Sequence, residues 1–126
     1  MIDALFSDSN YLAAKKMLDV TAMRHEAIAS NLANIETPNY KRLDVSSTFE
    51  SQLQQAVSSK DPAQISGMQP LLTVDTTAIS GRSDGNTVQL ESEMLKLNQN
   101  VVENALETQL VSSSLMTMRM AITGKA

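Results

Sequence analysis

The sequence predicts a mainly α-helical protein in which two long terminal helices form an antiparallel coiled-coil hairpin, with a short helix and an irregular, short-strand segment between them. Residues 9–35 and 89–122 both carry a seam of residues at alternating intervals of three and four, which is typical of a helix that packs along another helix. The 126 residues fit a single domain, and only 3% of them are aromatic. This composition favours helix packing over a thick β core.

The N-terminal helix is expected over residues 9–35, with Asp8 or Ser9 as its N-cap. Pro38 lacks the amide hydrogen that a helix needs and restricts the residue before it, so the helix should end between Ala33 and Ile35. The face predicted to pack on the other long helix holds Tyr11, Ala14, Leu18, Thr21, His25, Ile28, Leu32 and Ile35.

The middle segment, residues 36–86, differs from both ends because it is rich in turn-forming residues. Ser47 and Glu50 have the spacing of a capping box, which predicts a short helix over residues 48–58. The segment has too few apolar residues for a core of its own, so we expect it to be mobile in a free monomer. Three shorter pieces, two strands and a turn, are expected at residues 71–74, 76–79 and 81–86.

The C-terminal helix, residues 89–122, has the most regular pattern in the chain. Apolar residues also lie outside its main seam, and residues 108–118 carry no charge, so this end should pack on more than one neighbour. Pairing the polar seam residues of the two helices predicts a register in which Thr21 lies opposite Thr108. The seam holds Leu90, Met94, Leu97, Val101, Asn104, Thr108, Val111, Leu115, Met118 and Ile122.

The composition argues against several classes of function. The net charge is −4 and the ten basic residues form no cluster, which argues against nucleic-acid binding. Cysteine is absent, and we interpret the single histidine, His25, as a core residue rather than a catalytic group or a metal ligand. We therefore expect no catalytic site, no cofactor and no metal. Residues 1–10 lack the basic start and the apolar run of a signal peptide, and no stretch approaches a membrane span of about 20 apolar residues.

Both ends of the chain resemble a known family. Residues 30–40, SNLANIETPNY, are similar to the N-terminal signature of bacterial flagellar basal-body rod and hook axial proteins, which usually has Gly at the position of Asn39. Asn tolerates left-handed backbone geometry better than other non-Gly residues, so the turn should survive. Residues 84–94, DGNTVQLESEM, and the ending MRMAITGKA resemble the opening and the close of the last helix in the short proximal rod proteins. The first motif is carried by Ser30, Asn31, Leu32, Ala33, Asn34, Thr37, Pro38 and Tyr40.

The resemblance implies a structural subunit without enzymatic activity. Such proteins are secreted through the flagellar type III export apparatus without a cleaved signal peptide. They assemble in the periplasm into a hollow helical rod of the basal body. The implied partners are copies of the chain, other flagellar rod proteins, the rod-base adaptor FliE, and the MS ring or export gate, with no nucleic acid and no membrane insertion. The residues expected to pack in the assembly are Leu18, Ile28, Leu97, Val101, Leu106, Val111, Leu115 and Met118.

The alternative interpretation is a soluble coiled-coil adaptor or secretion chaperone, which would also have two seamed helices and no catalytic groups. Concentration-dependent polymerisation would favour the rod subunit. A stable dimer with both long helices protected from hydrogen exchange would favour the chaperone.

Overall fold

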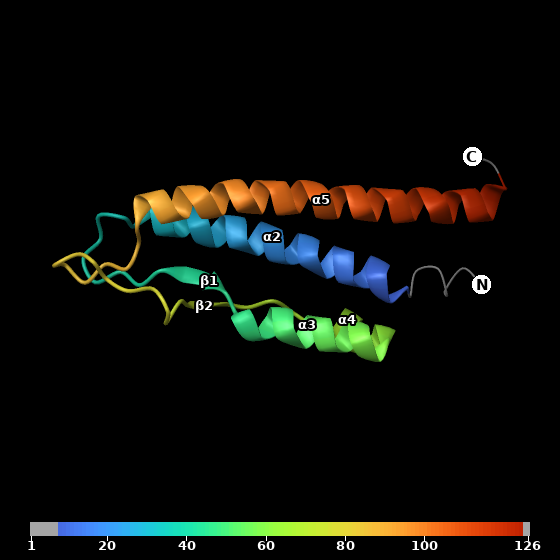
Figure 1. Cartoon of the computed structure of the whole chain (residues 1–126), viewed down its shortest axis with the longest axis horizontal. Coiled ribbons are helices and arrows are strands. Elements are labelled where there is room, and N and C mark those ends of the chain that lie inside the picture. The colour runs from blue at the N-terminus through green and yellow to red at the C-terminus, as the bar shows by residue number, and fades with distance from the viewer. Residues whose placement is uncertain (1–7, 125–126) are drawn as a thin grey trace.

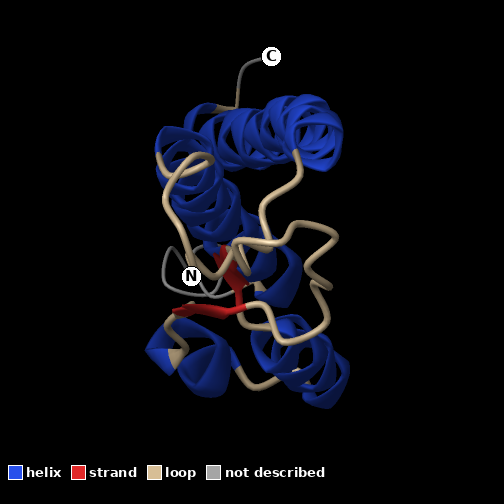
Figure 2. Cartoon of the chain, turned by 90° about the vertical axis from the view of Figure 1, so that its left-hand side faces the viewer, coloured by secondary structure: helices blue, strands red, loops and turns tan. Residues whose placement is uncertain are grey.

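The computed structural model describes residues 8–124, which form three tiers along one long axis (Figures 1 and 2). Helix α5 is one outer tier, α2 lies in the middle, and a two-stranded sheet with α3 and α4 forms the third tier. Residues 1–7, which belong to the stretch considered above for a signal peptide, and residues 125–126 lie outside the described part. In chain order the elements are α2 (Ser9–Ala33), β1 (Leu43–Val45), α3 (Ser47–Ser59), α4 (Pro62–Gly67), β2 (Leu72–Val74) and α5 (Leu90–Thr123).

The ends of α2 follow from local chemistry. The Asp8 side chain accepts hydrogen bonds from the backbone N–H groups of Asn10 and Tyr11 at 2.8 and 3.4 Å, which confirms Asp8 as the N-cap. The helix ends at Ala33, and the chain then turns through Asn39. The φ angle of Asn39 is 60°, which is the left-handed geometry that the family's usual Gly would adopt.

The two short strands pair in antiparallel fashion, with Leu43 opposite Val74 and Val45 opposite Leu72. The second predicted strand, residues 76–79, is wrong. Asp75 ends the pairing there because its carboxylate accepts hydrogen bonds from both the backbone N–H and the hydroxyl of Thr77, at 2.9 and 2.6 Å. These bonds close a local turn that competes with a strand.

Helix α3 forms where the spacing of Phe49, Leu53 and Ala56 gives it one apolar face. The predicted capping box is wrong, because Ser46 is the N-cap residue and makes no side-chain capping bond. Glu50 pairs instead with Arg24 of α2 at 2.5 Å. Helix α4 was not predicted. It has a capping residue, Asp61, and begins with Pro62 at the first helical position.

The hydrophobic core lies between α2 and the middle segment. Val20 of α2 and Ile65 of α4 are fully buried there, and Phe49 and Leu53 of α3 are each 4% exposed. The middle segment therefore shares a core with α2, although it has too few apolar residues to build one alone. The complete cluster is Val20, Val45, Phe49, Leu53, Ala56 and Ile65.

Helices α2 and α5 lie side by side and run in opposite directions (Figure 1). Their register differs from the predicted one. Asn100 and Asn104 both donate hydrogen bonds to Thr21, to its carbonyl and its hydroxyl oxygen respectively, each at 2.8 Å. The predicted register placed Thr108 at this point, so α5 is displaced along α2 by at least one helical turn.

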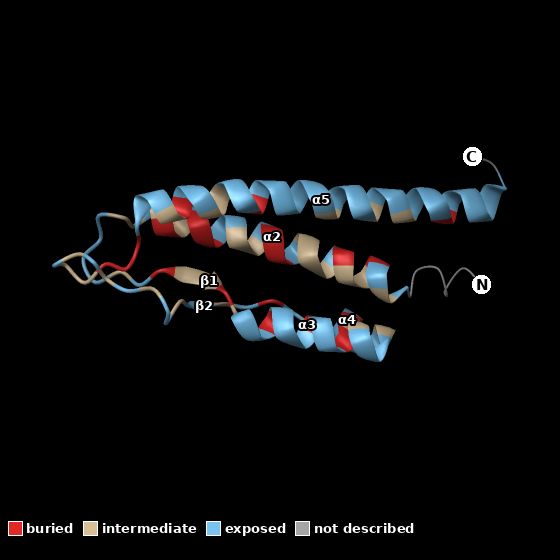
Figure 3. Cartoon of the chain, in the orientation of Figure 1, coloured by how far each residue is buried: buried red, intermediate tan, exposed pale blue. Residues whose placement is uncertain are grey.

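The face of α5 that meets α2 also differs from the predicted seam. Glu93 is fully buried and Asn100 is 3% exposed, whereas their seam neighbours Met94 and Val101 are 44% and 56% exposed. Figure 3 shows that most of α5 is exposed along its length. The helix is therefore rotated by one residue, about 100°, and the continuous seam predicted for a coiled-coil hairpin is not formed within one chain.

His25 is exposed, so its prediction as a core residue is wrong, although Tyr11, Ala14, Thr21 and Ile28 of the same predicted face are buried. Thr21 and Ile28 are buried on one face of α2. Arg24 lies between them along the helix and forms ion pairs with Asp44 and Glu103. Relative to Arg24, His25 lies on the opposite side of the line from Thr21 to Ile28, and it is exposed.

Candidate assembly interface

The end of α2 is held by Asn31, a fully buried residue of the first family motif. Its Nδ2 donates to the carbonyl oxygen of Leu43 at 2.9 Å, and its Oδ1 accepts from the Leu43 N–H at 2.8 Å. The side chain thus satisfies the backbone of β1 as a neighbouring strand would. Tyr40 adds a contact of 3.0 Å between its hydroxyl and that of Ser30, which closes the turn on α2.

The second family motif packs directly on the first through Asn86, which is 1% exposed. Its Nδ2 donates to the carbonyl oxygens of Asn34, Ile35 and Thr37, at 3.0, 3.1 and 2.8 Å. These carbonyls follow the end of α2 and have no helical partner, so Asn86 acts as a cap supplied from a distant segment. The Asn86 Oδ1 also accepts from the N–H of Val88 at 2.7 Å, just before α5 begins.

Backbone contacts continue this union of the two motifs. Asn39 donates its N–H to the carbonyl of Asp84 at 2.9 Å, and Thr87 donates its N–H to the carbonyl of Tyr40 at 3.1 Å. A Cβ on Gly85 would lie 2.6 Å from the Asn39 Oδ1, and the Gly85 φ angle is 77°. Gly85 is therefore suited both to its backbone geometry and to the close approach of the turn.

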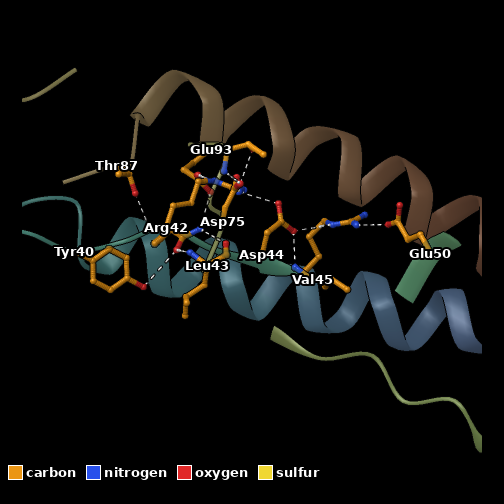
Figure 4. Close-up of polar contacts among 12 residues, drawn as sticks. Tyr40, Arg42, Leu43, Asp44, Val45, Glu50, Asp75, Thr87 and Glu93 are labelled. Carbon is orange, nitrogen blue, oxygen red and sulfur yellow. Dashed lines mark hydrogen bonds and ion pairs between the residues drawn. The ribbon is translucent and has the colours of Figure 1, made fainter. Parts of the chain in front are cut away.

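A buried ion pair joins this region to the start of α5 (Figure 4). Arg42 follows the turn and donates from Nε to a Glu93 oxygen at 2.5 Å and from Nη1 to Asp75 at 2.7 Å. Their side chains are 4% exposed for Arg42 and 0% for Glu93. Asp44 also lies 2.9 Å from the Arg42 Nη1, so three carboxylates surround one guanidinium. We call Asn31, Arg42, Asn86 and Glu93 the polar joint.

The charges in the polar joint support one another. Burial alone lowers the pKa of Arg42, but Glu93 and Asp44 raise it above its ordinary value, so the guanidinium stays charged. Burial alone raises the pKa of Asp75, whereas hydrogen bonds from Thr77 and Arg42 lower it below its ordinary value. The joint therefore holds the first turn of α5 in one orientation at neutral pH.

That orientation turns the polar side of α5 inward. Glu93 and Asn100 meet the inner tier, Asn104 bonds to Thr21, and Glu103 pairs with Arg24 of α2 at 3.2 Å. A buried polar residue costs free energy unless it is paired, and these residues use the inner face to find partners. Most of the large apolar side chains of α5 are left exposed, whereas Met118 is buried.

The outward face of α5 is the largest set of exposed apolar side chains in the described chain. Eleven of the fourteen large hydrophobic residues that are exposed belong to this helix. We call them the outer apolar face, and they correspond to the exposed surface of α5 in Figure 3. Monomeric proteins rarely expose so many large apolar side chains on one helix, and such exposure is a common feature of interaction sites. Its members are Leu90, Met94, Leu95, Val101, Val102, Leu106, Leu110, Leu115, Met116, Met120 and Ile122.

Within residues 8–124 the acidic, histidine and cysteine side chains form no group of three or more that could hold a metal ion. The described helices also include none that is long and apolar enough to cross a membrane. The features that stand out are therefore the polar joint and the outer apolar face.

No family model matches the chain. Three curated relatives are each named flagellar basal body rod protein FlgB. The protein of Borrelia hermsii is 33% identical in an alignment 113 residues long, which covers 75% of this chain and 82% of the relative. The chain belongs to the FlgB family. The relative from Borreliella burgdorferi is 32% identical, covering 68% of this chain and 74% of its own, and that from Aquifex aeolicus is 29% identical, covering 89% and 91%.

This result confirms the family that the two motifs indicated. In this FlgB relative the first motif lies at the end of α2 and in the following turn. Asn31 is buried, Ser30, Leu32, Asn34 and Tyr40 are half-buried, and Ala33, Thr37 and Pro38 are exposed.

The eight predicted packing residues of this FlgB relative do not all lie on one surface. Val101, Leu106 and Leu115 belong to the outer apolar face and are 56%, 57% and 43% exposed. Ile28 and Met118 are buried already, at 1% and 6% exposure. The half-buried remainder is Leu18, Leu97 and Val111.

Three of the four residues of the polar joint were not predicted as site residues from the sequence, namely Arg42, Asn86 and Glu93. Arg42 follows the first family motif closely and Asn86 belongs to the second. This proximity to the motifs is the sequence signal that could have identified them. Glu93 has no local signal of its pairing, because its partner Arg42 lies 51 residues away in the chain.

Proposed function

We propose that this chain is a structural, non-enzymatic subunit of the proximal rod in the bacterial flagellar basal body. The observation that carries the proposal is the orientation of α5, which turns buried polar residues such as Asn100 inward and an apolar face outward. The outer apolar face needs neighbouring subunits to cover it. Membership of the FlgB family supplies the assembly in which those neighbours occur.

In this proposal the long helices complete a coiled-coil hairpin only in the rod, where neighbours supply the seam that one chain lacks. The residues proposed to pack there include Val101, Leu106 and Leu115, which are exposed in the single chain. Each Å² of apolar surface removed from water contributes a free energy of about 25 cal/mol, which favours this assembly. The packing of each α5 on more than one neighbour would close the subunits around a channel.

The proposed partners are copies of this chain, the other rod proteins, FliE, and the MS ring or export gate. The proposed route is the flagellar type III export apparatus, without a cleaved signal peptide, and the proposed location is the periplasmic part of the basal body. The family motifs support these proposals by the resemblance that they carry.

Deletion of the gene followed by complementation tests the proposal. Wild-type protein should restore the rod and appear in isolated basal bodies. Leu115→Asp should abolish incorporation while the monomer stays soluble, because it places a charge on the outer apolar face. Gln55→Asp, an exposed position on α3, is the matched control and should incorporate normally. Recovery of the wild-type chain from the cytoplasm alone, as a stable dimer, would contradict the rod function.

A further inference from the structure

A groove lies between α2, α3 and α5, next to the hydrophobic core, to which its lining residue Leu53 belongs. Its volume is about 620 Å³. Met17, Leu53 and Val57 give it an apolar floor, and Glu103 and Glu107 of α5 line one edge. A groove with an apolar floor and a charged edge fits an amphipathic helix better than a polar small molecule.

The lining of the groove has more carboxylates than cations. Arg24 is its only basic lining residue, and it is already shared among Asp44, Glu50 and Glu103, at 3.3, 2.5 and 3.2 Å. Glu107 forms no hydrogen bond or ion pair with any residue in the described part of the chain. Burial and the neighbouring Glu103 raise the pKa of Glu107, which is the effect of a carboxylate without a counter-charge.

The last turns of α5 carry the complementary features. Met116 and Met120 are 66% and 41% exposed, and Arg119 lies between them on the same face of the helix. The guanidinium of Arg119 makes no ion pair with residues 8–124. Methionine side chains are flexible enough to fill an irregular apolar groove.

The end of α5 cannot reach the groove of its own chain. Arg119 follows Glu107 by twelve residues of continuous helix, a separation of about 18 Å along the axis. The cation and the carboxylates can therefore meet only between two copies. Because the groove and the helix end are different surfaces, such a contact is head-to-tail, which builds a ring if the rotation closes and an open helical array if it does not.

We propose that the groove of one subunit receives Met116–Thr123 of a second copy, with Arg119 of that copy beside Glu103 and Glu107. This inference rests on the proposed function and adds to it the contact between like subunits. The part of the outer apolar face that precedes Met116, from Leu90 to Leu115, then remains for the other neighbours in the rod.

Disulfide trapping tests the contact, because the chain has no cysteine of its own. Cells should produce two variants together, Gln54→Cys at the groove and Met120→Cys on the helix end, and their basal bodies should be isolated. We expect a disulfide-linked dimer that contains one chain of each kind. Gln52→Cys is the matched control, because it lies two residues away on α3 and does not line the groove, so it should give no dimer with Met120→Cys.

Charge reversal supplies an independent measurement. Arg119→Glu and Glu107→Arg should each lower the amount of the chain in basal bodies by about tenfold or more, because each places like charges together. The two substitutions combined should restore incorporation. Lys60→Glu, at an exposed position outside the groove, should have no effect.

The outcomes separate this inference from the proposed function. Rods that contain both cysteine variants but no linked dimer, together with no rescue in the double charge reversal, would overturn the contact and leave the rod function intact. The absence of the wild-type chain from basal bodies would overturn both. Failure of Glu107→Arg alone, with Arg119→Glu incorporated normally, would assign the groove to a different rod protein and refute the self-contact.

Discussion

Asn100 of α5 donates a hydrogen bond from Nδ2 to the main-chain carbonyl of Thr21 on α2, at 2.8 Å, and is 3% exposed. The next residue, Val101, is 56% exposed. The helix thus places an amide inside and an aliphatic side chain outside, which reverses the usual arrangement for a helix on a core. A surface that another chain covers explains this reversal.

Replacement of Asn100 should loosen α5 from α2. Asn100→Ala removes the bond and leaves the Thr21 carbonyl without it, so the free energy of unfolding should fall by about 1–3 kcal/mol. Asn98→Ala, at an exposed position on the same helix, should change it by less than about 0.5 kcal/mol. Urea denaturation of both variants measures the difference, and equal stabilities would contradict the role of Asn100.

The buried pair of Arg42 and Glu93 should be more costly to break. Glu93→Ala leaves a buried guanidinium with only Asp44 and Asp75, so we expect a loss of about 3 kcal/mol in the free energy of unfolding. Glu91→Ala removes an exposed carboxylate from the same first turn and serves as the control. Thermal unfolding at the same midpoint for both variants would contradict the polar joint as a stabilising contact.

Asn86 should be required for the union of the two family motifs. Asn86→Ala removes one donor from each of the three carbonyls after α2 and the acceptor of the Val88 N–H, which should cost about 1–3 kcal/mol. Native-state hydrogen exchange should show faster exchange at the end of α2 and at the start of α5. Faster exchange confined to residues 80–88 would show that Asn86 stabilises only its own loop.

The lowered pKa of Asp75 predicts an acid dependence of stability. Its carboxylate stabilises the folded state fully above the unfolded pKa of about 3.9, and this contribution is lost as the pH falls through the lower folded value. Asp75→Asn should therefore lose less stability than the wild type between about pH 4 and pH 2. Asp19→Asn, at an exposed position, should follow the wild type. Urea midpoints across this range provide the measurement, and parallel curves for Asp75→Asn and the wild type would contradict the prediction.

The helices could be read from the sequence because their signals are local. Asp8 caps α2, Pro38 forces the turn after it, and the spacing of Phe49 and Leu53 marks α3. The left-handed geometry of Asn39 was expected instead from the family resemblance, because Asn stands where the family usually has Gly. Helix α4 has signals too, Asp61 and Pro62, but its six residues are too short for a periodic pattern.

The orientation of α5 could not be read from the sequence. A seam analysis assigns the apolar residues Met94 and Val101 to the inside, because a single chain gains most by burying them. Here Glu93 and Asn100 take the inside, since Arg42 and Thr21 supply their partners. Those partners lie far away in the chain, so no local sequence pattern indicates the pairing.

The central claim is that the outer apolar face of α5 is covered by other subunits in the rod. Thiol labelling of Val102→Cys tests it most directly, because Val102 is 68% exposed and the chain contains no other cysteine. The introduced thiol should react rapidly with a maleimide in the monomer and be protected in isolated basal bodies, whereas Gln55→Cys on α3 should react in both. Equally rapid labelling of Val102→Cys in assembled rods and in the monomer would contradict the claim.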